Sequence, residues 1–110
     1  MQTSKALFGQ TVQATAAIKG RTFANFTGGT AAPGAAAKGA YRTDATVGEY
    51  VTVEQLGTSL VIAGSALDAG DAVEVGANGY AVAHSAGVIV GRAENATAIG
   101  QAAEIFHIHA

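Results

Sequence analysis

The chain has 110 residues, which is enough for one small domain. Hydrophobic residues make up 49% of it, charged residues only 13%, and about a quarter of all residues are alanine. This composition is the opposite of the charge-rich pattern of disordered chains. The absence of cysteine excludes a disulfide framework and a thiolate metal site, and a net charge of −2 argues against a strongly basic nucleic-acid-binding protein.

The beginning of the chain does not resemble a targeting segment. Only Leu7 and Phe8 form an apolar pair after Lys5, and polar residues then interrupt them. A signal peptide needs a continuous apolar stretch of about 7–15 residues, and a membrane-spanning helix needs about 20. We therefore expect a protein that is made in a cytoplasm and has no membrane partner.

Residues 1–46 are basic, rich in Ala, Gly and Thr, and poor in large apolar side chains. They hold five Lys or Arg residues against one Asp, a net charge of +4. Between Phe26 and Tyr41 almost every residue is small, so this stretch has little apolar surface to offset an ordering cost of about 1–2 kcal/mol per residue. The pattern predicts an extended N-terminal arm that becomes ordered against a partner.

Residues 47–110 have the pattern of a compact β domain with a net charge of −6. Short β-prone runs occur at 47–53, 60–63, 72–75, 80–83, 87–91 and 103–109. Asn78-Gly79 between two of these runs is a strong hairpin signal. About six short strands at this spacing predict an all-β fold, either a small β-barrel or a β-sandwich.

A β domain of this size is expected to need support from other subunits. A domain of about 60 residues buries only about 60% of its unfolded surface. Its many alanines add little buried area, and no disulfide reinforces it. Oligomerisation is the remaining common source of stability.

Two stretches, residues 66–76 and 87–108, share a pattern of glycine-punctuated strands. Written as aGDaVxVG followed by GvivGrAxxxatAxGxxaxIxhI, this pattern resembles the small head-decoration, or capsid cement, proteins of tailed bacteriophages. The resemblance implies a non-enzymatic, β-rich protein that binds the outside of the phage head, commonly as a homotrimer. It also implies the major capsid protein as partner, the exterior of the virion head as location after synthesis in the host cytoplasm, and no cofactor.

The basic segment offers the candidate contact residues for the capsid or a neighbouring subunit. Four cations spread over 24 positions form a weak footprint for nucleic acid, so we expect no nucleic-acid partner. Docking onto an acidic protein lattice, or along the open edge of a neighbouring sheet, suits an extended segment better. The candidates are Lys19, Arg21, Phe23, Phe26, Lys38 and Arg42.

Three histidines raise the question of a metal site. His107 and His109 are two residues apart on a predicted strand, so they point to the same face, and His84 could approach them in space. Two histidines do not complete a zinc site. The preferred interpretation is a final strand with two polar residues on its exposed or intersubunit face, with metal binding by these histidines as the alternative.

Two other functions remain open beside capsid decoration. One is another self-assembling virion protein, such as a fibre, spike or surface-layer component. The other is a small β-barrel enzyme that uses a metal bound by histidine. The His84-Ser85 pair lacks the surrounding glycines of a nucleophile elbow, so we expect no enzyme activity.

Overall fold

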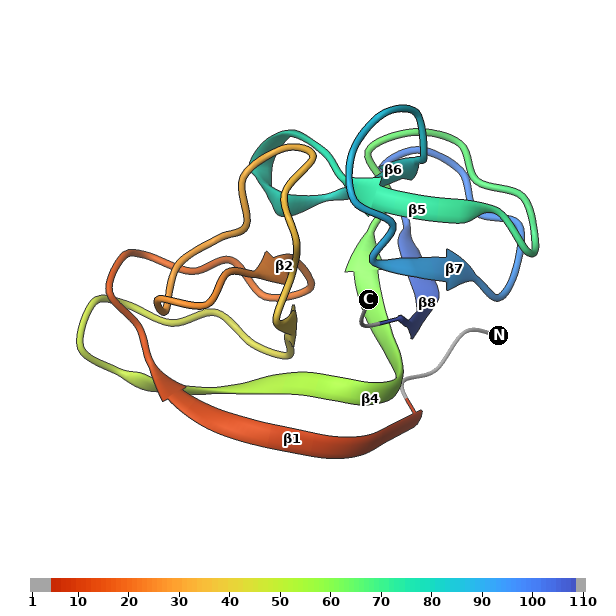
Figure 1. The fold of residues 1–110 in the computed structure, drawn as a ribbon. Helices are drawn as coiled ribbons and strands as arrows, with labels where there is room; N and C mark the ends of the chain where they lie inside the picture. The colour runs from red at the N-terminus through yellow and green to blue at the C-terminus, as the bar shows by residue number, and fades with distance from the viewer. Residues whose placement is uncertain (1–4, 109–110) are drawn as a thin grey trace.

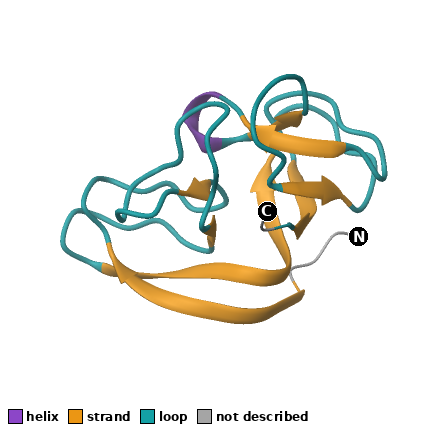
Figure 2. Ribbon diagram, viewed as in Figure 1, coloured by secondary structure: helices purple, strands orange, loops and turns teal. Residues whose placement is uncertain are grey.

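The computed structural model describes residues 5–108, and side chains from residue 9 onward. The strands are β1 (Lys5–Gln13), β2 (Phe23–Ala24), β3 (Gly39–Tyr41), β4 (Tyr50–Ile62), β5 (Ala72–Val75), β6 (Ala81–Ala83), β7 (Gly91–Ala93) and β8 (Ala102–His107), with a short 3-10 turn η1 (Ala77–Gly79) (Figures 1 and 2). This confirms the predicted all-β class. Within these residues no helix has the length and apolarity needed to cross a membrane.

All eight strands belong to one sheet, in which β4 pairs with three others, β1, β3 and β8. The order is β2-β3-β4-β8-β7-β5-β6, and β1 pairs with β4 in addition. The first part of β4 lies antiparallel to β1, and its last five residues pair with β8 (Figure 1). Gly57, with a φ of +85°, lies next to this change of partner, where the β1 register also shifts. A positive φ of this kind bends a strand, and glycine adopts it without steric cost.

The second half of the chain curls into a nearly closed barrel. From β4 the sheet continues through β8, β7, β5 and β6. Ala81 in β6 then forms a parallel bridge with Ala63, which directly follows β4, and the Gly64 amide donates to the Ala81 carbonyl at 2.7 Å. Of the two predicted architectures, the barrel is therefore the one that forms.

Some of the predicted strands are confirmed, two form a single strand, and one is wrong. The strand at 72–75 and the Asn78-Gly79 hairpin are confirmed, with φ of 60° and 75° at the two turn residues, and β5 pairs antiparallel with β6. The separate strands predicted at 47–53 and 60–63 are one strand, β4, because positive φ at Gly57 bends the chain without ending the strand. The strand predicted at 87–91 is wrong, since β7 begins only at Gly91.

A turn-and-strand unit occurs three times, at residues 47–53, 69–75 and 99–105. Their sequences are VGEYVTV, AGDAVEV and IGQAAEI. The glycine of each unit has nearly the same φ, +89°, +86° and +85°. In each unit the next residue donates its amide to the carbonyl three residues earlier, at 3.1–3.2 Å. Each glycine amide also donates to the carbonyl of a distant alanine, so the three units are built and anchored alike.

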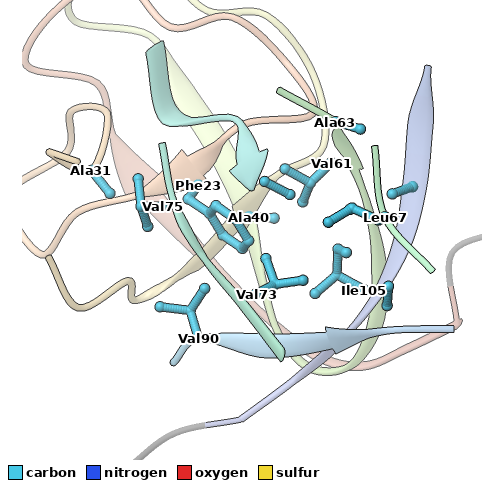
Figure 3. Close-up of a cluster of buried hydrophobic side chains, with 13 residues drawn as sticks. Phe23, Ala31, Ala40, Val61, Ala63, Leu67, Val73, Val75, Val90 and Ile105 are labelled. Atoms are coloured by element: carbon cyan, nitrogen blue, oxygen red, sulfur yellow. The ribbon is translucent and has the colours of Figure 1, made fainter. Parts of the chain in front are cut away.

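Residues 9–46 do not form the extended arm that the sequence predicts. Phe23 is completely buried in the main core cluster beside Val61, Val73 and Ile105 (Figure 3). A second cluster joins Ile18, Ala24 and Tyr41, all before position 46, to Val51 and Val53 of β4. Both clusters cross the expected boundary at residue 46, so the two halves share one core system.

Small residues allow this segment to fold because backbones approach one another closely. The amide of Gly34 donates to Val75 at 2.8 Å, and the amide of Val88 donates to Gly34 at 3.0 Å. A Cβ atom added at Gly87 would lie 2.6 Å from the Cα of Gly34. The glycines and alanines between residues 27 and 40 thus bury backbone against backbone, a gain that side-chain bulk does not reveal.

Burial predicts very different effects for two phenylalanines that are close in sequence. Replacing Phe23 by alanine removes a fully buried ring and should lower the free energy of unfolding by about 3–5 kcal/mol. Phe26 is 65% exposed, so Phe26→Ala is the matched control and should cost less than about 1 kcal/mol. Urea unfolding followed by circular dichroism measures both, and equal effects would contradict the burial of Phe23.

Candidate functional site

A cleft lined by cationic side chains lies beside β2 and β3. Arg21 lies just before β2 and Arg42 directly after β3, at the same end of this antiparallel strand pair. One hollow of about 270 Å³ is lined by Arg21, Arg42, Thr43, Glu54 and Leu60. A second, of about 450 Å³, shares the first three and adds Lys19, Gly20, Asp44 and Ile62. We call the two adjoining hollows the cationic cleft.

The backbone of the cationic cleft is fixed at an unusual conformation. Arg21 has a φ of 62°, which is uncommon for a residue with a side chain. Two hydrogen bonds of 2.8 Å hold it there, one from its amide to the Tyr41 carbonyl and one from the Ile62 amide to its carbonyl. The Gly20 amide donates to Asp44 Oδ1 at 2.7 Å. The rim of the cleft is thus tied to both β3 and β4.

The charged group of Lys19 has a partner within the chain, whereas those of Arg21 and Arg42 have none in the part of the chain that the structure describes. Lys19 Nζ donates to the Tyr80 hydroxyl at 2.8 Å and lies 5.2 Å from the centre of that ring. Neither guanidinium group, of Arg21 or of Arg42, has a hydrogen-bond or ion-pair partner among residues 5–108. Two such groups beside one hollow can accept an anion without breaking an existing contact.

An apolar groove forms a second surface feature. It has a volume of about 270 Å³ and is lined by Phe26, Ala36, Ala37, Val88, Ile89, Val90 and Ile108. Phe26 and Val88 are largely exposed. The groove therefore lies between the loop after β2 and the segment before β7, which the Gly34–Val88 hydrogen bond holds together.

The predicted contact residues lie in four different places in the fold. Lys19, Arg21 and Arg42 meet in the cationic cleft, and Phe26 lines the apolar groove. Lys38 is half-buried just before β3 and lines neither of these two hollows. Phe23 is in the core, so its predicted contact with a capsid or subunit is not available in this fold.

The histidines do not meet in the part of the chain that the structure describes. His107 is buried within the chain, not on an exposed or intersubunit face as the sequence predicts, and its Nε2 lies 2.7 Å from Ser59 Oγ. His84 is exposed, with Nε2 2.9 Å from the Gly87 carbonyl oxygen. His109 lies outside the described residues, and between residues 5 and 108 no three His, Asp or Glu side chains are grouped as metal ligands.

Glu74 is a polar residue whose role the sequence does not reveal. Its side chain is buried, and Oε1 accepts hydrogen bonds from the amides of Ser85 and Gly87 at 2.5 and 3.1 Å. These two hydrogen bonds, chiefly the one from Ser85, lower the pKa of Glu74, with a smaller contribution from the charge of His84. Glu74 thereby fixes the loop that forms one side of the apolar groove.

Comparisons with known proteins identify the fold. No family model and no curated protein sequence matches the chain. Among solved structures, the head fiber gp8.5 N base in bacteriophage phi29 matches with a TM-score of 0.77 and 22% sequence identity. The match covers 92% of this chain and 93% of that one, so almost the whole described barrel has the architecture of that protein.

The lowered pKa of Glu74 predicts a stability that depends on pH. A carboxyl group with a lower pKa in the folded state stabilises fully above its unfolded pKa of about 4.5, and this stability is lost as the pH falls through the folded value. In Glu74→Gln the unfolding free energy should fall at pH 7 and should depend less on pH below about 4.5.

Urea unfolding between pH 3 and 7 measures this profile. The exposed Glu94 provides the control, because Glu94→Gln removes one carboxyl group without touching the loop at residues 84–88. A Glu74→Gln profile parallel to that of the unsubstituted protein would contradict the role assigned to Glu74.

Proposed function

We propose that this chain is a structural, non-enzymatic component of a bacteriophage virion that binds the outer surface of the head. The observation that carries the proposal is the fold, which matches the N base of a phage head fibre over nearly the whole of both chains. The glycine-punctuated pattern at residues 66–76 and 87–108, which resembles head-decoration proteins, points to the same setting.

In the proposed role, many copies bind the major capsid protein and bridge adjacent capsomers. Each contact is small, and attachment at several points converts weak contacts into a stable shell. The chain acts as a homotrimer, made in the host cytoplasm and placed on the head exterior. The cationic cleft supplies one surface for contact with subunits or capsid. The apolar groove, with its exposed Phe26 and Val88, supplies another.

A second role is favoured by the description of the matching structure as the base of a head fibre. The chain would then anchor a fibre to the head instead of cementing capsomers. A cement protein should raise the temperature at which heads disassemble, whereas a fibre base should bind without changing that temperature.

Purified protein tests the virion role directly. Mixed at physiological salt with heads assembled without it, the chain should co-sediment at a saturating, fixed number of copies per head. The denaturation temperature of the decorated heads then distinguishes cement from fibre base. Sedimentation equilibrium of the free protein measures the oligomer. A protein that leaves heads undecorated at saturating concentration would reject the proposed function.

A further inference from the structure

We propose that the cationic cleft is a receptor for a carboxylate side chain of an acidic polypeptide segment, gripped between Arg21 and Arg42. The inference deepens the proposed function, on which it rests for the identity of the partner: the segment belongs to a protein of the head surface. The inference names the chemical class of ligand that the cleft binds and the two side chains that bind it.

The first argument is the placement of two free guanidinium groups. Arg21 and Arg42 flank the paired strands β2 and β3 and line both hollows of the cleft. Neither has a polar partner among the described residues. A guanidinium group presents its N–H donors as a planar fork that matches a carboxylate. Two such groups around one hollow can donate hydrogen bonds to both oxygens of the carboxylate.

The second argument is the surroundings of this pair. Leu60 and Ile62, both half-buried on β4, form apolar walls, and Thr43 adds a hydroxyl group. Apolar walls lower the local dielectric constant, which strengthens a charge-assisted hydrogen bond relative to one in open water. A carboxylate in the cleft would therefore bind more strongly than at an isolated surface arginine.

The third argument is the strain at Arg21. A residue with a side chain at a φ of 62° costs free energy that glycine would not incur. Strain of this kind is concentrated at binding and catalytic sites, where the side chain is needed in a fixed place. The backbone hydrogen bonds to Tyr41 and from Ile62 hold Arg21 in this conformation, so the point from which its side chain leaves the backbone is fixed at the rim of the cleft before a ligand arrives.

The charges around the cleft favour one carboxylate over a nucleic acid. Asp44 and Glu54 line the cleft itself, and Glu49 lines an adjoining hollow with Lys19 and Asp44. A phosphate backbone carries closely spaced charges and needs an extended basic surface. It would meet these acids at several positions, whereas a single carboxylate needs only the arginine pair. An acidic peptide is the ligand class that fits.

Titration with a defined peptide tests the cleft. Fluorescein-labelled hexaglutamate is added to the protein at low salt and followed by anisotropy, with labelled hexaglutamine and a 12-nucleotide single-stranded DNA as comparison probes. Hexaglutamate should bind saturably, hexaglutamine should not, and the DNA should bind more weakly. In 15N spectra the Nε–H signals of Arg21 and Arg42 should shift during the same titration.

Three variants assign the binding to the pair. Arg21→Gly removes the guanidinium and relieves the positive φ, so the fold is kept, and Arg42→Gln removes the other fork. Each should weaken hexaglutamate binding by about tenfold or more, the size of one charge-assisted hydrogen bond. Arg92→Gln, on β7 away from the cleft, loses the same charge and should bind as the unsubstituted protein does.

Different experimental results would reject the cleft as a carboxylate receptor and reject the proposed function. No saturable hexaglutamate binding, equal losses in all three variants, or tighter binding of the DNA would each overturn the carboxylate receptor. Head binding that is unchanged in the Arg21→Gly, Arg42→Gln double variant rejects the cleft as the head contact and keeps the proposed function. Hexaglutamate binding by a protein that fails to decorate heads rejects the proposed function and keeps the cleft.

Discussion

The structure depends on β4, the longest strand, which contributes residues to both core clusters. It pairs with β1, β3 and β8, and its positive φ at Gly57 lets it bend from the first partner to the last. Val51 and Val53 belong to one cluster and Val61 to the other. In a chain with few large apolar residues, a single long strand that serves two clusters allows each cluster to be completed by segments that bury little by themselves.

Close backbone contact is the second means by which this composition forms a core. Alanine and glycine lose the area-dependent gain of larger side chains, and they permit approaches that larger side chains would block. At Gly39 an added Cβ atom would collide with the carbonyl of Glu54 in β4, and at Gly91 with the carbonyl of Phe106 in β8. The many short strands are therefore joined by hydrogen bonds along closely spaced chains, with modest hydrophobic clusters between them.

The candidate sites follow from this architecture. The antiparallel pairing of β2 with β3 brings Arg21 and Arg42 to the same end of the strand pair, and the backbone hydrogen bonds of Arg21 to Tyr41 and Ile62 fix the rim of the cleft. The apolar groove depends in the same way on the Glu74 carboxylate, which ties the loop after β6. A barrel with a cationic cleft and an apolar groove on its surface, and with no α-helix among its described residues, is suited to rigid attachment, the role proposed for it on a phage head.

The sequence by itself determined the all-β class and the Asn78-Gly79 hairpin, because alternation and turn chemistry are local properties. The contact role of the three basic residues of the cleft stays a prediction. The turn unit that occurs three times is visible in the sequence as VGEYVTV, AGDAVEV and IGQAAEI, but the unequal spacing of its copies makes it hard to recognise as a repeat. Only the tertiary structure decided that Phe23 is core, that His107 is buried, and that residues before 46 complete both core clusters. Those outcomes depend on long-range backbone approach, and the small residues that permit it have the same composition as a flexible arm.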